Sequence, residues 1–329
     1  MRVLVTGGAG YIGSHTVRRL QECGYQPWVL DNLSTGHRPA VAPDLLTVAD
    51  LADRQAVANV LRQRNIEAVV HFAASALVGE SVQAPEKYYR NNFVHTLNLV
   101  EAMRATGVGK LVFSSTCATY GVPDRVPIRE HCPQQPINPY GRTKLAIEWL
   151  LADFAAAHGF GYAALRYFNA AGAAAGGDIG EDHTPESHLI PLTLQVALGQ
   201  RSHISIFGSD YGTPDGTCIR DYIHVEDLAD AHIQALAKLE GGKGLCLNLG
   251  TGRGYSVKEV IAACAEAAGK PIPTQTVGRR SGDPPELVAD NTLATKTLGW
   301  RPKHVDLAPI VSSAWNWHRT HPHGYGSND

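Results

Sequence analysis

The chain has 329 residues, with 29 Lys and Arg against 31 Asp and Glu, so it lacks the basic excess typical of proteins that bind nucleic acid or acidic membranes. No apolar run is long enough to span a bilayer, and no leader peptide is recognisable. The length predicts about two domains. We therefore expect a cytoplasmic protein that acts on a small molecule, without nucleic-acid or membrane partners.

Cysteines and histidines give no sign of a metal site. The sequence contains 6 Cys and 15 His, without a C-x-x-C pair, and none of the cysteines lies at zinc-ligand spacing with a histidine pair. We expect reduced, mostly buried thiols and no metal. The cysteines are Cys23, Cys117, Cys132, Cys218, Cys246 and Cys264.

The first thirteen residues predict a strand, a glycine-rich turn and a helix. Arg2–Thr6 is apolar and β-branched, and a helix is expected from Tyr11 to beyond Leu20. Such a turn leaves unpaired N–H groups at the helix N-terminus, where the helix dipole favours a pyrophosphate. Gly7 permits the tight turn, Gly10 lets phosphate oxygens approach the backbone, and Gly13 lets the helix pack against the strand.

Asp31 identifies the expected dinucleotide. It ends a second strand, Trp28–Leu30, at about the distance from the glycines where an acidic residue meets the adenosine ribose. A carboxylate there accepts bonds from both ribose hydroxyls and repels a 2′-phosphate, which favours NAD over NADP. The alternative interpretation is that Asp31 only begins the turn that follows.

Strands and helices continue to alternate up to Asn169, which predicts an α/β fold of the Rossmann type, a doubly wound parallel sheet. Asp50 closes the third strand, where it would accept a bond from the adenine amino group. The further strands are expected at 45–48, 68–74, 110–116 and 163–169, and the helices at 52–64, 139–158 and, as one long helix, from Pro85 to about Met103.

The pattern changes after Asn169. Residues 170–186 indicate a loop, a helix follows at 188–199, and a strand at 204–207. A strand at 221–225 and a helix at 226–239 suggest a return to the first domain. Residues 245–300 supply a strand (245–249), a helix (257–268) and a polar loop (279–283). We expect an NAD-binding domain over 1–169, with a return segment of about 217–240, and a mainly substrate-binding domain over 170–329.

Tyr140 and Lys144 lie one helical turn apart, after a strand that ends in Thr116. A free tyrosine has a pKa near ~10, and a neighbouring ammonium together with a nicotinamide's positive charge would favour its phenolate. The Thr116 hydroxyl would bind the same substrate oxygen. This set suits removal of a proton from an alcohol that loses hydride to NAD. The alternative is a packed tyrosine beside a solvated lysine.

Longer motifs resemble the extended short-chain dehydrogenase/reductase family, and within it the UDP-sugar 4-epimerases. They are VTGGAGYIGSH, HFAA, VGES, FSST, ATYG, NPYGRTK, RYFNAAG and RDYIHVEDLADAH, which span most of the chain to about Trp300. The resemblance implies a retained NAD that takes hydride from C4 of the sugar, rotation of a 4-keto intermediate, and return of hydride to the opposite face. The implied reaction interconverts UDP-galactose and UDP-glucose.

The resemblance also implies site residues, with Tyr140, Lys144 and Thr116 as the catalytic group. Those expected to contact NAD are Gly7, Gly10, Tyr11, Ile12, Gly13, Asp31, Asn32, Asp50, Leu51, Phe72, Ala73, Ala74, Asn92, Tyr140, Lys144 and Phe168. Those expected to hold the UDP-sugar are Thr116, Tyr140, Asn169, His188, Leu189, Ser205, Ile206, Phe207, Arg220, Arg280, Asp283 and Leu287.

Three positions depart from familiar bacterial members of that family. Thr116 replaces a serine and keeps its hydroxyl. Ala76 replaces a lysine that reaches the cofactor phosphates. Leu287 stands where a tyrosine closes the pocket around the sugar 2-substituent and a smaller residue opens it, so we hypothesise some activity on UDP-N-acetylglucosamine.

Other interpretations remain open. UDP-arabinose or UDP-glucuronate epimerases would differ only around C5 of the sugar. A 4,6-dehydratase carries acidic residues after the strand-five threonine, where this chain has Cys117 and Ala118. A non-catalytic NAD sensor would tend to lose Tyr140. The resemblance also implies a homodimer, formed through the helix near 86–104 and the helix after Tyr140.

Overall fold

A parallel sheet of seven strands organises the larger part of the molecule, in a computed structural model that describes residues 1–280 and 282–326. The strand order is β10-β6-β5-β4-β1-β2-β3, and all neighbours run parallel. The strands are β1 (Arg2–Thr6), β2 (Gln26–Asp31), β3 (Leu46–Val48), β4 (Ala68–His71), β5 (Lys110–Thr116), β6 (Gly161–Tyr167) and β10 (Gly244–Leu249). This is the doubly wound Rossmann-type sheet that the alternation of elements predicts.

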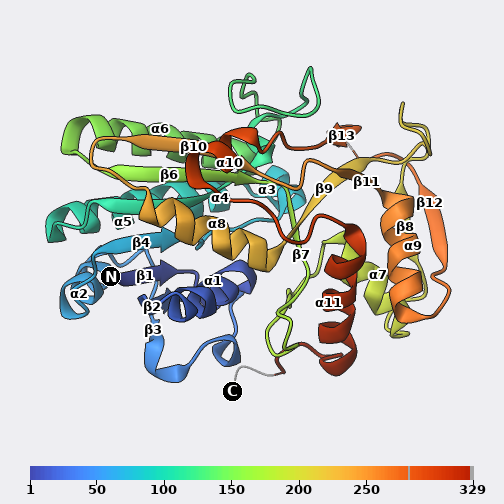
Figure 1. The fold of residues 1–329 in the computed structure, drawn as a ribbon, viewed down its shortest axis with the longest axis horizontal. Helices are drawn as coiled ribbons and strands as arrows, with labels where there is room; N and C mark the ends of the chain where they lie inside the picture. Colours follow the sequence, from blue (N-terminus) through green and yellow to red (C-terminus); the bar gives the residue numbers. More distant parts are fainter. Residues whose placement is uncertain (281, 327–329) are drawn as a thin grey trace.

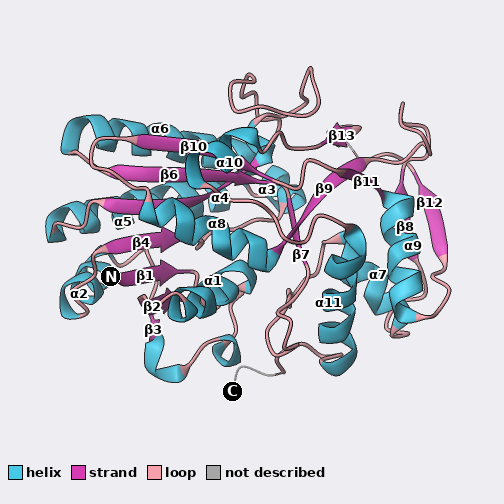
Figure 2. Ribbon diagram, in the orientation of Figure 1, coloured by secondary structure: helices cyan, strands magenta, loops and turns pink. Residues whose placement is uncertain are grey.

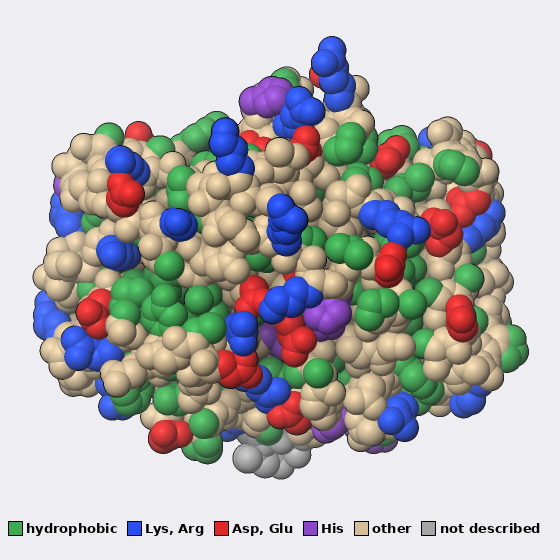
Figure 3. All heavy atoms as spheres, viewed as in Figure 1, with side chains coloured by type: hydrophobic (Ala, Val, Ile, Leu, Met, Phe, Trp, Pro, Cys, Tyr) green, Lys and Arg blue, Asp and Glu red, His purple; other side chains and the backbone are tan. Residues whose placement is uncertain are grey.

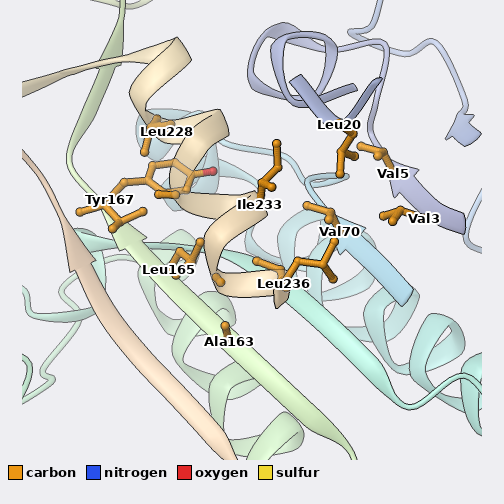
Figure 4. Packing of buried hydrophobic residues seen from close by; sticks show 14 of the residues in the cluster. Val3, Val5, Leu20, Val70, Ala163, Leu165, Tyr167, Leu228, Ile233 and Leu236 are labelled. Carbon is orange, nitrogen blue, oxygen red and sulfur yellow. The ribbon is translucent and has the colours of Figure 1, made fainter. Parts of the chain in front are cut away.

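Helices cover both faces of this sheet (Figures 1 and 2). Successive strand side chains point to opposite faces, so Val3 and Val5 face one helical layer and Leu4 the other. In Figure 4, Leu228 and Leu236 of α8 lie over the strands that carry Leu165 and Val70. One layer contains α1 (Tyr11–Glu22), α8 (Val225–Ala237) and α10 (Thr292–Leu298), and the other contains α2 (Arg54–Gln63), α5 (His95–Thr106) and α6 (Pro139–His158).

A smaller part lies beyond the carboxyl ends of the main strands, on the right in Figure 1. Its longer sheet places β9 (Ile219–His224) between β11 (Gly254–Ser256) and β13 (Glu286–Leu287), with β7 (Asn169–Ala171) also paired to β9. A second sheet pairs β8 (Ile204–Phe207) with β12 (Thr274–Val277). The helices here are α7 (Leu189–Ala197), α9 (Val257–Ala268) and α11 (Leu307–Thr320). The short helical segments are η1 (Arg38–Ala40), η2 (Pro43–Leu45), α3 (Val78–Gln83) and η4 (Cys117–Thr119).

The connection between the two parts differs from the sequence expectation. The strand at 245–249, which the sequence pattern assigns to the second part, is instead β10 and pairs in parallel with β6 at the edge of the main sheet. The strand expected to return at 221–225 is β9 and belongs to the smaller sheet. The return therefore runs through α8 and β10. β10 is short and mostly apolar, and β9 is short and mixes apolar with charged residues, so neither pattern says which sheet the strand joins.

The expected helix from Pro85 is continuous, but it is not α-helical throughout. The chain forms α4 (Pro85–Tyr88), a π-helical turn η3 (Tyr89–Val94) and then α5. The wide turn contains Asn92, a buried residue whose amide bonds outside the helix. Such turns are common at functional sites because they reposition single side chains without ending the helix.

Charged side chains gather near the centre of the face seen in Figure 3, beside α1 and α8. They bond mainly to one another: Arg19 reaches Asp230 at 2.5 Å, and Lys303 reaches the same carboxylate at 2.6 Å. None of these residues belongs to the expected cofactor or substrate set. Among the described residues, no helix has the length and apolar character that crossing a bilayer requires.

Candidate active site

The glycine turn between β1 and α1 is tightly packed on one side and open on the other. Gly7 has φ +72°, and a Cβ there would lie 2.6 Å from the Ala73 nitrogen. A Cβ on Gly13 would lie 2.2 Å from the Gly7 oxygen, whereas one on Gly10 would meet only that oxygen, at 3.4 Å. Gly10 begins α1 without a side-chain cap. The first N–H groups of the helix are thus available to an anion, as a dinucleotide requires.

The two expected adenosine ligands sit on neighbouring strand ends. Asp31 is buried, and its carboxylate accepts bonds from the backbone nitrogens of Ala9 (2.9 Å) and Leu33 (2.8 Å). Burial raises the pKa of Asp31, and these two bonds act against the rise. Asp50 accepts a 2.7 Å bond from the Asn32 amide. A carboxylate has further acceptor sites beyond two bonds, so both residues fit a nucleoside.

Asn92 supports the segment that follows β4. Its carbonyl oxygen accepts a 2.8 Å bond from the Ser75 nitrogen, and its amide nitrogen donates to the Ser75 oxygen at 3.0 Å. The nitrogens of Phe72 and Ala73 donate to the Thr6 oxygen at 2.8 and 3.1 Å. Residues 72–75 are therefore held beside the glycine turn. Asn92, expected as a cofactor ligand, mainly positions this segment.

The remaining expected cofactor residues are spread around these elements. Tyr11 is buried at the start of α1, and its hydroxyl donates a 2.6 Å bond to the Gly172 oxygen. Ile12 packs against the core on the α1 side of the sheet, and Leu51 on the other side. Ala74 is half-buried, and Phe168 is buried in a small apolar cluster with Cys117.

Thr116, Tyr140 and Lys144 converge where β5 meets α6. The Lys144 ammonium donates a 2.8 Å bond to the Ser114 oxygen and lies 5.9 Å from the centre of the Tyr140 ring. The Thr116 side chain lies close enough to the Tyr140 hydroxyl to lower its pKa. Lys144 is 3% exposed and Thr116 7%. The alternative of a solvated lysine is therefore wrong.

Burial shifts the pKa values of this pair in opposite directions. It lowers the pKa of Lys144 to about 7. It raises the pKa of Tyr140 to about 12, against the effect of the Thr116 side chain. Burial disfavours the charged form of each group. The chain by itself keeps the phenol neutral, so a phenolate at neutral pH requires the positive charge of a bound nicotinamide.

The expected substrate residues form two contacts in the smaller part. Arg220 of β9 forms an ion pair with Asp283, and the Arg280 guanidinium stacks 4.3 Å from the centre of the Phe207 ring. Leu287 pairs in register with Arg220 and packs on the apolar cluster that contains Cys117 and Phe168. The structure thereby brings Leu287 toward the end of β5.

The other expected substrate residues lie on separate elements. Asn169 opens β7 opposite Tyr222. Ser205 and Ile206 lie in β8, and Leu189 begins α7. His188 caps α7, and its Nδ1 atom faces the carboxylate of Glu181 in a short contact. These residues do not form one continuous cluster in the structure.

A buried ion pair behind the catalytic group was not foreseen from the sequence. Arg166 and Glu148 meet at 2.6 Å, and both side chains are about 95% buried, at 5% and 4% exposure. Glu148 also accepts a bond from Ser115, next to Thr116. Two features of the sequence could have revealed the pair. Arg166 is a lone charge inside the apolar strand β6, and Glu148 lies one helical turn after Lys144.

Known proteins resemble the chain throughout its length. The model of the NAD dependent epimerase/dehydratase family matches residues 3–250. The UDP-glucose 4-epimerase of Halalkalibacterium halodurans is 53% identical over 330 residues, covering 100% of this chain and 99% of that one.

Solved structures of UDP-sugar 4-epimerases also resemble the chain over nearly its whole length. The crystal structure of UDP-glucose 4-epimerase from Brucella ovis in complex with NAD has a TM-score of 0.92 at 50% identity, covering 96% of this chain and 98% of that one. The UDP-Glc/GlcNAc 4-epimerase of Campylobacter jejuni has a TM-score of 0.84 at 43% identity, covering 97% and 99%. With a cradle for a dinucleotide beside a half-buried Tyr140 and a buried Lys144, the chain belongs to the NAD-dependent epimerase/dehydratase family.

Proposed function

We propose that the chain interconverts UDP-galactose and UDP-glucose by epimerisation at C4, with a retained NAD. The observation that carries the proposal is the meeting of Thr116, Tyr140 and Lys144 at the end of β5, in a family that uses NAD. The relatives named UDP-glucose 4-epimerase match over nearly the whole chain, which supports this choice within the family.

The two parts of the molecule divide the ligands in this proposal. The main sheet with α8 and β10 would hold NAD, by the open N-terminus of α1 and the acceptors Asp31 and Asp50. The smaller part would hold the UDP-sugar. Arg220 and Arg280 would bind the diphosphate, because a guanidinium donates forked hydrogen bonds to phosphate oxygens. The Arg220–Asp283 pair would keep one of these guanidinium groups in position.

Tyr140 would act as the base. NAD, when bound, supplies a reversible hydride acceptor for C4 of the sugar. Tyr140 would take the proton of the 4-hydroxyl and later return it, while Thr116 holds the same oxygen by its hydroxyl. The buried Lys144 ammonium would favour the phenolate by its charge. Cys117 and Ala118 provide no acid or base for loss of water, which separates this chemistry from that of a dehydratase.

We also propose a homodimer in the cytoplasm. The helical face around α6 exposes large apolar side chains, including Val82 and Trp149 at 63% each, with Tyr89 at 43% and Val94 at 45%. A contiguous apolar patch of this kind is typical of a protein interface. The cysteines are free thiols, which suits a reducing compartment.

Activity on UDP-N-acetylglucosamine is a second candidate. Leu287 is half-buried in the two-residue strand β13, beside Arg220 and toward the end of β5. Leucine is smaller than the tyrosine that would close the space around the sugar 2-substituent. The similarity to a UDP-Glc/GlcNAc 4-epimerase supports this candidate.

A coupled assay tests the main proposal. The purified protein is given UDP-galactose without added NAD, and formation of UDP-glucose is followed. Turnover without added cofactor is the expected result. NAD released on denaturation but no turnover would redirect the proposal to N-acetyl, pentose or uronate sugars. Absence of both turnover and NAD would contradict it.

A further inference from the structure

Four potential metal ligands meet in the segment between β7 and α7. Glu181, His183, Glu186 and His188 lie within eight residues of chain, and their ligand atoms all lie within 4.8 Å of one another. The two carboxylates are buried, with Glu181 4% and Glu186 6% exposed. The two histidine side chains are 29% and 50% exposed. The cluster is thus closed on its acidic side and open to solvent on its histidine side.

The spacing of these atoms fits a tetrahedron. The Nδ1 atom of His183 lies 3.3 Å from Glu181 and 3.5 Å from Glu186, and the Nδ1 atom of His188 lies 3.6 Å from Glu186. Zn²⁺ binds nitrogen and oxygen at about 2.0–2.2 Å in tetrahedral sites, which places neighbouring ligand atoms about 3.3–3.6 Å apart. Three of the four His–Glu separations therefore have the length of an edge of a zinc site, although His183 faces one oxygen of Glu186 and His188 faces the other.

Hydrogen bonding accounts for the position of Glu186, which accepts bonds from the backbone nitrogens of Ser187 at 2.6 Å and His188 at 2.8 Å, but it accounts less well for the contacts between imidazoles and carboxylates. An N–H···O bond is usually about 2.7–3.2 Å long. Of the four contacts between an imidazole and a carboxylate in this cluster, only the one between His188 and Glu181 is that short. The other three separations are longer than good hydrogen bonds, although both Nδ1 atoms point at both carboxylates. Two buried carboxylates held this close repel each other, and a dication between them would remove that repulsion.

We propose that Glu181, His183, Glu186 and His188 bind one Zn²⁺ ion. Two carboxylates and two neutral imidazoles balance the charge of the ion, and imidazole is a preferred zinc ligand. All four positions are filled by the protein, which is the pattern of a structural and not a catalytic zinc. His183 and His188 have the H-x4-H spacing of common zinc motifs, but the cysteine pair that accompanies it there is missing, which explains why the sequence suggested no metal.

The ion would fix a junction between the two parts of the molecule. The oxygen of Glu181 accepts a 3.0 Å bond from the Trp317 indole in α11, and the oxygen of Asp182 lies 3.0 Å from the ring nitrogen of His37. The ring of Tyr11, at the start of α1, lies 6.2 Å from that of His183. The proposed zinc would tie this junction to the N-terminus of α7 through His188. The inference does not depend on the proposed reaction.

Metal content gives the direct test. The full-length protein is stripped with a chelator, dialysed against buffer containing Zn²⁺, freed of excess metal, and measured by mass spectrometry of the element. About one zinc per chain is expected. Loading with Co²⁺ in place of zinc should give the intense visible absorption of a tetrahedral site. A chain that retains no zinc, or weak octahedral cobalt bands, would overturn the proposal.

Variants locate the ion. Glu186→Gln and His183→Gln should weaken zinc binding by more than ~100-fold, since loss of an outer-shell partner alone costs ~10–100-fold. The matched control is His304→Gln, which alters the other described grouping of this kind, His224, Glu226 and His304, and should keep its zinc. Retention of NAD reports that each variant is folded. Loss of zinc in the control, or full retention in the Glu186 variant, would refute the assignment.

Discussion

The Lys144 ammonium donates a 2.8 Å hydrogen bond to the main-chain oxygen of Ser114, two residues before Thr116. The bond ties the start of α6 to the end of β5, the two elements that supply the proposed acid–base group. It satisfies one of three donors of a side chain that is 3% exposed. The remaining donors are available to a ligand at this end of the sheet.

Lys144→Met should separate charge from packing. Methionine fills similar space but carries no positive charge, so the phenol of Tyr140 would stay neutral. We expect turnover of UDP-galactose to fall by ~10²–10⁴-fold, the usual contribution of acid–base catalysis, with less NAD retained. Lys110→Met, at an exposed strand end, is the control and should leave both unchanged. Wild-type turnover in the Lys144 variant would contradict the role.

Tyr140→Phe removes one oxygen and keeps the ring that packs edge-on against Tyr88 at 6.5 Å. NAD should still copurify and the melting temperature should barely change, whereas turnover should fall by ~10²–10⁴-fold. Absorbance of the released nucleotide and the coupled assay measure the two properties. The half-exposed Tyr89→Phe serves as the control. Near-normal turnover in the Tyr140 variant would refute the assigned base.

The buried pair of Arg166 and Glu148 should contribute strongly to stability. Glu148→Ala leaves the guanidinium of Arg166 buried without its partner, which typically costs ~3–5 kcal/mol. Urea unfolding followed by fluorescence measures the loss. Glu101→Ala breaks the more exposed pair with Arg54 and should cost at most ~1 kcal/mol. Equal losses in both variants would show that burial of the pair does not matter.

Acid should destabilise the fold through buried histidines. Burial lowers the pKa of His71 to about 3 and the pKa of His15 and His232 to about 4, from an ordinary 6.5. The unfolded chain therefore binds more protons below pH 6.5, so the free energy of unfolding falls as pH drops from 6.5 toward 4. For each histidine, a pKa difference of about one unit between the folded and the unfolded chain changes this free energy by up to ~1.4 kcal/mol.

Urea midpoints measured between pH 8 and pH 4.5 check this expectation. Stability should fall increasingly below pH 6.5. His232→Gln should make the fall shallower, whereas the exposed His131→Gln should not. A stability that rises toward pH 5 would contradict the argument.

Leu287→Tyr should narrow the substrate range. The larger ring beside Arg220 and the apolar cluster around Cys117 would fill space that an N-acetyl group needs. We expect the ratio of UDP-N-acetylglucosamine turnover to UDP-galactose turnover to fall by at least ~10-fold. A change of about one methylene group in a pocket already alters discrimination between substrates by this factor. Undetectable turnover of the N-acetyl sugar by the unaltered protein at saturating concentration would end the hypothesis.

The local pattern predicted most of the fold. Strand Arg2–Thr6, strand Lys110–Thr116 and helix Pro139–His158 occur with the expected bounds, because apolar periodicity and a proline at a helix start are local properties. The placement of β9 and β10 was not predictable in this way. A strand this short is compatible with either sheet, and its pairing partner is chosen by tertiary packing.

The candidate site shows the same limit. Thr116, Tyr140 and Lys144 were found because their types and spacing reflect one chemistry. The support that Asn92 gives to residues 72–75 and the pair of Arg166 with Glu148 were missed, because they depend on a π-helical turn and on contacts across the sheet. The cluster around His183 escaped because its H-x4-H spacing has no accompanying cysteine pair.

The position of β10 has a consequence for how the chain is made. The main sheet receives its edge strand from residues 244–249, after the chain has passed through much of the smaller part. A ribosome that has released only the first 169 residues has delivered six of its seven strands, and neither α8 nor α10 is yet present to cover the apolar side chains on one face. The nascent main sheet therefore exposes an unpaired edge and an uncovered face while the smaller part is still being synthesised.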